Sequence, residues 1–394
     1  MHGINLIGFA KGSYGLGVTT RVMAKKLIAD GIPFCIVDIT SIISPKRDNF
    51  KEDFVEFEQY FSDRAIYDVN LIIFGVSFFK KGFTKIEKAI EMRGKFNVLM
   101  PFLENYELGR PFLMLKNKFD MYIAPTRFIQ YALMRQIDNA YIEYMPPPLF
   151  IDRRIKATLS KGKMKDKNKK FTFYFNFDLN SGIDRKNPYL LIRSFLEEFG
   201  NDDTVLLVLK VTGADLKQNA GLVVSLSKIA ADKKNIQIIF DYLSYDQNLK
   251  LIASADCYVS PHRSEGLGNG LFEAMQLGVP CIATGYGGNA DFMNHNNSIL
   301  IKYELEYIMA KDYRSWLGAL KDYWGNPSHL ELMFAMRSVR EDTKLRERII
   351  ENARNETNQL QEKFIASNVF EAIFTKYEYE KTKGNFSLRR TALV

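Results

Sequence analysis

The chain has 394 residues, 46% hydrophobic and 25% charged, a balance typical of a folded protein with two cores of ordinary size. Its net charge of +8 would attract phosphate-rich partners, but no DNA- or RNA-binding signature accompanies it, so we expect no nucleic-acid partner. The longest apolar run, near Leu71–Phe79, is too short to span a bilayer, and the first twenty residues do not read as a signal peptide, which predicts a cytoplasmic protein.

Three cysteines, Cys35, Cys257 and Cys281, each lie within an apolar run, and no CxxC pair is present. This pattern indicates buried thiols in a reducing compartment, without disulfides or a zinc site.

The first forty residues set a strand–helix–strand pattern. An apolar strand is predicted at 4–10, a glycine turn GSYGLG at 12–17, an amphipathic helix at 18–31 and a second strand at 33–40. Such a unit implies a parallel sheet. The alternation continues with strands at 70–79, 95–102 and 120–126 and a helix at 84–94.

A domain boundary is predicted after MPPP at 145–148, where a lysine-rich stretch runs from about 156 to 170. We therefore expect one domain over 1–160, joined by a C-terminal helix at 370–394, and a second over 165–369. The basic clusters at 161–170 and 78–95 fit either a solvated linker and helix face or contact with an anionic partner.

A second alternating series follows the boundary. Strands are predicted at 171–177, 203–211, 236–243, 257–262 and 280–285, with helices at 187–200, 221–232, 246–256 and 270–278. The strands are continuous apolar runs, as parallel strands covered on both faces should be. From about 313 to 380 the chain is predicted to be helical. Two doubly wound α/β domains imply ligand binding at the carboxyl ends of their strands.

The stretch RSEGLGNGLFEAM at 263–275 places two carboxylates, Glu265 and Glu273, around a glycine loop that leads into a helix. Glycines let the backbone approach a ligand, and the first N–H groups of a helix suit phosphate or sugar oxygens. Glu273 in the first turn could accept hydrogen bonds from two adjacent hydroxyls. Either glutamate alone is equally well explained by the helix dipole or by a surface loop.

The whole string is more specific, because Gly278, Pro280, Thr284, Gly287, Gly288 and Asp291 follow at set spacings. It resembles the retaining GT-B glycosyltransferases called group-one glycosyl transferases. The resemblance implies two Rossmann-like domains of doubly wound parallel sheets facing a central cleft, with a helical C-terminal tail. It implies that Glu265 contacts the donor sugar and Glu273 the nucleotide ribose, with backbone amides of Gly266, Leu267, Gly268 and Asn269 at the sugar and diphosphate.

The segment NSGIDRKNPYLLIRSF at 180–195 adds positive charge. Lys186 matches the family lysine that neutralises the leaving diphosphate. Many relatives place an arginine where this chain has Ser181, and Arg185 resembles the alternative of an E-R-K-N-P subgroup. Lys210, at the end of a predicted strand, is a weaker candidate of the same kind.

The N-terminal loop GSYGLG resembles the first-domain glycine loop of the family, which places Gly15 and Gly17 near donor phosphate. It also fits a dinucleotide-binding fingerprint, with Asp38 as the ribose-binding acid. In FLENYELGRP at 102–111, the family resemblance nominates Glu107 as facing the reacting centre, with Glu104 as the alternative.

Three further residues complete the predicted donor site. His262 would touch the donor or pack at a strand end, and Tyr242 and Leu243 would lie near the base. The aspartates of NDD at 201–203 fall in a turn, so no metal site and no cofactor other than the nucleotide sugar are expected.

The resemblance implies a retaining transfer of a hexose-type sugar from a nucleotide diphosphate sugar to a glycan or lipid-linked hydroxyl, of the kind used in bacterial surface polysaccharide synthesis. The basic segment at 78–95 would suit peripheral contact with an anionic membrane. Two other functions stay open: a noncatalytic GT-B-like binding or scaffold protein, and a GT-B nucleotide-sugar epimerase.

Overall fold

The computed structural model describes residues 2–43, 50–152, 155–156, 158–159, 170–213, 216–309 and 321–383. These residues form two compact units. Unit 1 comprises the described residues of Met1–Phe150, Arg314–Asp322 and Gln361–Val394, and unit 2 those of Ile151–Tyr313 and Tyr323–Leu360. Most of the predicted linker, at 160–169, lies outside the described residues.

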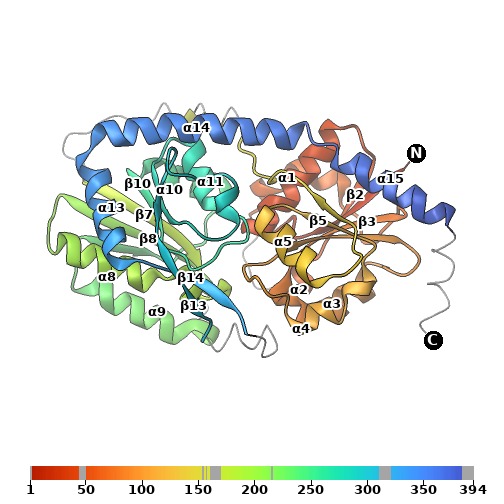
Figure 1. Ribbon diagram of the computed structural model, residues 1–394, viewed down its shortest axis with the longest axis horizontal. Helices are drawn as coiled ribbons and strands as arrows, with labels where there is room; N and C mark the ends of the chain where they lie inside the picture. The colour runs from red at the N-terminus through yellow and green to blue at the C-terminus, as the bar shows by residue number, and fades with distance from the viewer. Residues whose placement is uncertain are drawn as a thin grey trace. The chain divides into compact units, whose positions relative to one another are not determined.

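Unit 1 is built on a six-stranded sheet with the order β2-β1-β3-β4-β5-β6 (Figure 1). Every pair in it is parallel. Its strands are β1 (Ile4–Gly8), β2 (Phe34–Asp38), β3 (Val69–Gly75), β4 (Phe96–Phe102), β5 (Met121–Ala124) and β6 (Ile142–Tyr144). β6 did not stand out in the sequence.

Both faces of this sheet are buried. Alternate residues of β3 enter two different cores: Leu71 and Ile73 belong to one, Ile72 and Phe74 to the other. Because successive strand residues point to opposite faces, helices must cover both sides. The helices of unit 1 are α1 (Gly15–Ala29), α2 (Thr40–Ile43), α3 (Phe79–Ala89), α4 (Arg110–Leu113), α5 (Arg127–Gln136) and α15 (Val369–Thr382).

The C-terminal helix α15 belongs to unit 1 although it comes last in the chain. Phe370, Ile373 and Tyr377 lie in the same core cluster as β1, β3 and β4, and the Tyr377 hydroxyl lies 3.2 Å from Asp68. The boundary between the units falls inside the preceding long helix α14 (Thr343–Ile365), at Gln361.

Unit 2 holds the second six-stranded parallel sheet, with the order β12-β11-β10-β7-β8-β9. Read from β9, the strands follow the doubly wound order in which the first strand, β7, lies beside the fourth, β10. The strands are β7 (Phe171–Asp178), β8 (Val205–Thr212), β9 (Ile236–Ile239), β10 (Cys257–Ser260), β11 (Cys281–Thr284) and β12 (Ile299–Ile301).

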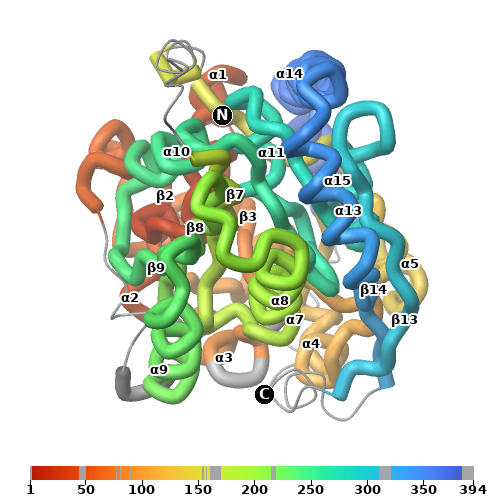
Figure 2. The backbone as a smooth tube through the Cα atoms, turned by 90° about the vertical axis from the view of Figure 1, so that its left-hand side faces the viewer, coloured from red at the N-terminus to blue at the C-terminus, as the bar shows by residue number. Residues whose placement is uncertain are grey.

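The helices of unit 2 are α7 (Ile183–Lys186), α8 (Pro188–Phe199), α9 (Leu216–Ala231), α10 (Tyr245–Ser254), α11 (Asn269–Gln276), α13 (His329–Glu341) and most of α14. The helices α8 to α11 follow the predicted alternation, whereas the short helix α7 was not predicted. In the turned view, α7 leads directly into α8 (Figure 2). No helix in the described part of the chain is long and apolar enough to cross a membrane.

The prediction of helix from about 313 to 380 is wrong at 323–327, and residues 313–320 of that prediction lie outside the described residues. Tyr323–Pro327 forms strand β14, which pairs antiparallel with β13 (Tyr303–Tyr307) as a separate two-stranded ribbon. The aromatic residues Tyr323 and Trp324 favour a strand, and β13 supplies the partner with which β14 pairs.

Candidate functional site

The candidate site lies at the carboxyl ends of β7 and β10 in unit 2. These two strands are adjacent, and the chain leaves them in opposite directions across the sheet, which makes this the topological switch point where doubly wound sheets bind ligands. The segment after β7 carries Arg185 and Lys186, and the segment after β10 carries Glu265. Lys186 and Glu265, which are 79 residues apart in the sequence, are thereby brought into direct contact.

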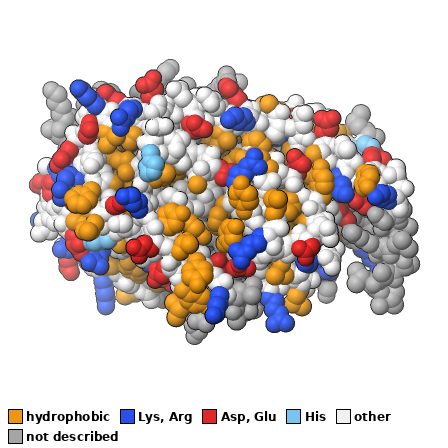
Figure 3. All heavy atoms as spheres, in the orientation of Figure 1, with side chains coloured by type: hydrophobic (Ala, Val, Ile, Leu, Met, Phe, Trp, Pro, Cys, Tyr) orange, Lys and Arg blue, Asp and Glu red, His pale blue; other side chains and the backbone are white. Residues whose placement is uncertain are grey.

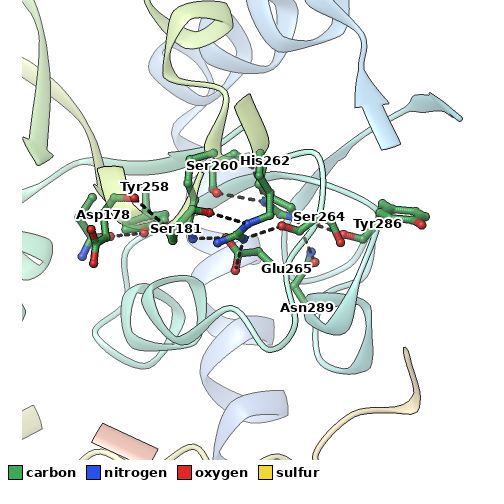
Figure 4. A network of polar contacts seen from close by, with 12 residues as sticks. Asp178, Ser181, Tyr258, Ser260, His262, Ser264, Glu265, Tyr286 and Asn289 are labelled. Carbon is green, nitrogen blue, oxygen red and sulfur yellow. Dashed lines mark hydrogen bonds and ion pairs between the residues drawn. The ribbon is translucent and has the colours of Figure 1, made fainter. Parts of the chain in front are cut away.

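Glu265 is the centre of a charged cluster. The Lys186 Nζ donates a hydrogen bond to Glu265 Oε1, and an Arg185 Nη1 lies 3.2 Å from Glu265 Oε2. Figure 4 shows Glu265 beside Ser264, with His262 and Asn289 close by. The two cations and one carboxylate leave a net positive charge at the switch point, as an anionic ligand requires.

These charges hold Glu265 ionised although it is buried. Burial alone would raise the pKa of Glu265, but the charges of Lys186 and Arg185 outweigh it and lower the pKa to about 2. The carboxylate is therefore a permanent hydrogen-bond acceptor at any physiological pH.

Arg185 is a buried cross-link rather than an exposed cation. Its side chain is 2% exposed, its Nε donates to the Ser181 carbonyl at 3.2 Å, and its Nη1 donates to the Ser264 carbonyl at 2.8 Å. Its own carbonyl accepts from the Arg263 N–H at 2.7 Å. Arg185 thus ties the segment after β7 to the loop that carries Glu265, and the prediction that it contacts the diphosphate stays a prediction.

Arg185→Ala is expected to lower the free energy of unfolding by about 3–5 kcal/mol, because it removes one partner of a buried ion pair and two carbonyl contacts. The urea midpoint measures this. Arg185→Lys restores the charge but not the planar guanidinium group with its several donors, so it should recover only part of the lost stability. A wild-type urea midpoint for Arg185→Ala would show that the cross-link is unimportant.

The glycine loop before α11 has the local geometry that the sequence predicts. Gly268 is the N-cap of α11 and has φ +89°, a conformation that favours glycine. Asn269 and Gly270 open the helix, where the N–H groups point out of the helix start. Gly266 and Leu267 are buried, whereas Gly268 and Asn269 are half-buried. The residues predicted to offer amides thus lie together at one helix start.

Gly287 and Gly288 lie against the backbone of Glu265. Gly287 has φ +106°, and a Cβ there would lie 2.5 Å from the Glu265 carbonyl oxygen. The Gly288 N–H donates to that carbonyl at 2.6 Å. Close backbone approach therefore explains the motif glycine at 287, and the Gly288 N–H adds a hydrogen bond that helps to set the position of Glu265.

Glu273 lies in α11, eight residues after Glu265, and burial rather than a neighbouring cation governs its pKa. It is 6% exposed, and burial raises its pKa to about 8 despite a hydrogen bond from Tyr245. A buried carboxylate that must exchange a proton near neutral pH is costly to keep, and such groups concentrate at functional sites.

Two polar residues beside α11 were missed in the sequence. The Tyr258 hydroxyl donates to Asn176 Oδ1, and Asn176 Nδ2 donates to Asn248 Oδ1 at 3.2 Å. A Cβ on Gly270 would meet the Tyr258 hydroxyl at 2.4 Å, so glycine is required there. The available signal was Asn176 itself, a polar residue inside the apolar run FTFYFNF.

Lys210 also lies near this end of the sheet. It is 6% exposed in β8, paired in register with Asn176 of β7. Burial lowers its pKa to about 8, against the opposing charges of Asp178 and Asp241. Its place near the strand end fits the predicted role, which stays a prediction.

His262 is fully buried and surrounded by protein atoms. Its Nδ1 lies 3.0 Å from Ser260 Oγ, and its Nε2 lies 3.1 Å from Asn289 Oδ1 and 3.2 Å from the Tyr286 carbonyl (Figure 4). Burial lowers its pKa, so the ring is neutral at pH 7. These contacts favour the packing alternative over donor contact. Tyr242 and Leu243 follow β9, where they are half-buried.

The glycine loop of unit 1 packs closely against the start of α1 and is bonded to Arg21 of that helix. A Cβ on Gly17 would lie 1.8 Å from the Gly12 carbonyl oxygen, and Arg21 Nη1 donates to the Gly12 carbonyl at 2.9 Å. Gly15 is the first residue of α1. Asp38 accepts from the Lys11 N–H at 3.0 Å and from Thr40 Oγ1 at 2.8 Å. Because these contacts engage the Asp38 carboxylate, they count against the dinucleotide-binding alternative, in which Asp38 would bind the ribose.

Glu107 lies before α4 and is paired within unit 1. Its Oε1 is 2.8 Å from Arg135 Nη2, and its N–H donates to Asp322 at 3.1 Å. Glu104 is half-buried in the same segment. The assignment of Glu107, with Glu104 as the alternative, to the reacting centre stays a prediction. Within the described ranges, no group of three or more His, Cys, Asp or Glu residues could hold a metal ion.

One protein-family model matches part of the chain. The profile of the glycosyl transferases group 1 matches residues 165–316, which is the stretch that holds β7, β10 and α11. A search of curated protein sequences finds no significant match.

Solved structures resemble the whole chain. HepE from Anabaena, determined with UDP and glucose, is 15% identical with a TM-score of 0.60, covering 95% of this chain and 100% of HepE. A sucrose-phosphate synthase from Thermosynechococcus elongatus is 14% identical with a TM-score of 0.61, covering 98% of this chain and 100% of the synthase. The pneumococcal O-GlcNAc transferase GtfA, determined with UDP and GlcNAc, is 14% identical with a TM-score of 0.53, covering 78% of this chain and 57% of GtfA.

These likenesses confirm the predicted fold class. The chain has the GT-B architecture of two Rossmann-like units with parallel sheets and a helical C-terminal tail.

Proposed function

We propose that this protein is a glycosyltransferase that moves a hexose-type sugar from a nucleotide diphosphate sugar to a hydroxyl of a glycan or glycolipid, with retention at the anomeric carbon. The observation that carries the proposal is the Lys186–Glu265 pair at the switch point of unit 2, one loop away from the start of α11. The group 1 match over the same residues supports it.

The proposed chemistry divides the work among these groups. Lys186 stabilises the negative charge that develops on the leaving diphosphate, together with the amides at the start of α11. Glu265 accepts hydrogen bonds from the sugar hydroxyls, and ionised Glu273 accepts them from the ribose. The acceptor hydroxyl attacks the anomeric carbon as the bond between that carbon and the diphosphate oxygen breaks. A phosphate oxygen of the leaving diphosphate takes the proton of the acceptor hydroxyl.

A panel of UDP-, GDP- and ADP-sugars tests the proposal by nucleotide release. UDP-glucose and UDP-GlcNAc come first, because structural neighbours were determined with UDP and glucose or GlcNAc. Slow nucleotide release supports a transferase. Interconversion of the sugars without release would indicate an epimerase, and no binding of any nucleotide would indicate a scaffold protein.

We also propose that no metal ion takes part, since Lys186 and the helix amides can hold the departing diphosphate. EDTA is then expected to leave nucleotide release unchanged, within about twofold, because no bound cation is removed. Restoration of a lost activity by Mg²⁺ or Mn²⁺ would contradict this.

We propose a surface polysaccharide or lipid-linked acceptor, reached by peripheral contact of the basic segment at 78–95 with anionic lipid. Within that segment Lys85 is exposed, whereas Glu87 pairs with Lys118. Co-sedimentation with phosphatidylglycerol vesicles should exceed that with phosphatidylcholine vesicles; equal co-sedimentation would reject membrane contact.

A further inference from the structure

The two-stranded ribbon of unit 2 is a feature that the sugar-transfer site does not use. β13 and β14 lie side by side, outside the six-stranded sheet (Figures 1 and 2). Tyr307 is opposite Tyr323, and Leu305 is opposite Gly325. Because strand side chains alternate, Tyr303, Leu305 and Tyr307 share one face with Tyr323. The segment that joins the two strands lies outside the described residues.

A further tyrosine completes this face. A Cβ on Gly325 would lie 2.9 Å from Cβ of Tyr286, so glycine leaves room for Tyr286 to lie across the ribbon. The rings of Tyr286 and Tyr303 have centroids 5.2 Å apart, and those of Tyr307 and Tyr323 are 5.7 Å apart. We call these four tyrosines and Leu305 the tyrosine face.

Three residues of the tyrosine face are exposed to solvent, and Tyr286 and Tyr307 are half-buried. The exposed fractions are 39% for Tyr303, 62% for Leu305 and 49% for Tyr323. Hydrophobic side chains gather over β13 and β14 in the surface view (Figure 3). Contiguous exposed apolar patches on a folded protein mark binding surfaces, whereas single exposed hydrophobic residues are ordinary.

The ribbon is attached to the loop that carries Glu265. The Gly325 N–H donates to the Arg263 carbonyl at 2.9 Å, Arg263 Nε donates to Asn326 Oδ1 at 3.3 Å, and the Arg263 guanidinium lies 5.3 Å from the Trp324 ring centroid. Tyr286 precedes Gly287, whose backbone packs on that of Glu265. The tyrosine face is therefore continuous in structure with the candidate donor site.

The chemistry of the face selects one class of partner. Tyrosine rings offer flat apolar surface with a hydroxyl at the edge, which matches the C–H faces and hydroxyls of pyranose sugars. The face itself carries no charged side chain, and the charges of β13 are the carboxylates of Glu304 and Glu306 on the opposite side. Those carboxylates disfavour an anionic membrane as the occupant.

We propose that the tyrosine face binds neutral sugar units of the acceptor glycan, a few units away from the hydroxyl that reacts. This inference rests on the proposed function, since it assumes that a glycan is the acceptor. A row of rings anchored to the Glu265 loop would hold a chain in a set orientation to the donor, so longer acceptors would bind better than single sugars.

The full-length protein is titrated calorimetrically with neutral hexasaccharides of glucose, mannose, xylose and N-acetylglucosamine, and separately with UDP. At least one hexasaccharide is expected to bind, and Tyr303→Ala with Tyr323→Ala should weaken it by at least about tenfold while leaving UDP affinity unchanged. Leu305→Lys, which removes no ring, should weaken it as well. Tyr131→Ala, at a tyrosine 57% exposed on α5 of unit 1, is the matched control and should have no effect.

The outcomes separate the two proposals. UDP binding without binding of any hexasaccharide would overturn the tyrosine face and leave the donor site standing, whereas failure to bind any nucleotide would overturn the proposed function. Hexasaccharide binding that survives the double substitution would also overturn the assignment. So would a change from dimer to monomer in gel filtration on the same substitution, because the face would then be an interface between copies.

Discussion

Lys186→Ala is expected to lower kcat for sugar transfer by about 10²–10³-fold, with a smaller change in the KM for the donor. The physical reason is that its ammonium group is the cation at the switch point with some exposure to solvent, at 16% of its side chain, whereas Arg185 is 2% exposed and bonded to two carbonyls. The charge that develops on a leaving diphosphate then has to be met by amides alone. Initial rates with saturating donor measure the effect.

The design of this experiment follows from the contacts of Glu265. In Lys186→Ala the carboxylate keeps Arg185, so the loop should stay in place and the urea midpoint should change little. Lys186→Arg keeps the charge and should retain more activity than alanine. Lys250→Ala, at an exposed lysine of α10, is the matched control. Half or more of the wild-type kcat in Lys186→Ala would rule out its proposed role.

Glu273→Gln is expected to stabilise the free protein at alkaline pH while weakening donor binding. The folded-state pKa of Glu273 is raised by burial from its ordinary 4.5 to about 8. Between these values the folded state holds a proton that the unfolded state has released, so the free energy of unfolding falls as pH rises. The cost is absent below about pH 4.5 and complete above about pH 8, on the order of a few kcal/mol. Glutamine removes it.

Thermal unfolding from pH 5 to pH 8.5 measures this effect as the difference between variant and wild type. The advantage of Glu273→Gln should grow with pH. Lys210 also titrates near pH 8, but it is present in both proteins and drops out of the difference. Tyr174 and Tyr258, whose pKa values burial raises above 10, stay neutral throughout. Glu341→Gln, at an exposed residue of α13, should show no such trend. If the stability difference between Glu273→Gln and wild type does not change with pH, Glu273 does not become a buried charge in this range.

Donor binding should change in the opposite direction. If ionised Glu273 accepts hydrogen bonds from ribose hydroxyls, then Glu273→Gln should weaken UDP binding by about tenfold or more at pH 8, because hydrogen bonds to a charged acceptor are worth roughly 1.5–3 kcal/mol. Wild-type affinity should rise from pH 6 to pH 8 as the carboxyl ionises, and the variant should lack that rise. An unaltered pH profile would show that Glu273 does not contact the ligand.

Local pattern was sufficient to predict the β7 and β10 strands, the loop at 263–270 and the start of α11. Apolar runs, glycines and a helix period are properties of neighbouring residues, and the predicted segments overlap the observed ones at β7, β8 and α8. The ribbon strands β13 and β14 were missed because each owes its existence to the other, 20 residues away, and the helix-like charge pattern around them carries no sign of that pairing.

The sequence by itself determined which chemical groups this protein can bring to an anion and a sugar, because those groups belong to a contiguous glycine loop and a short basic segment. It did not determine their states. That Arg185 is buried in backbone contacts, that Glu265 is held ionised, and that Glu273 titrates near neutral pH are consequences of which side chains surround each group. Solvent exclusion and charge partners come from strands distant in the chain, so only the tertiary structure decided them.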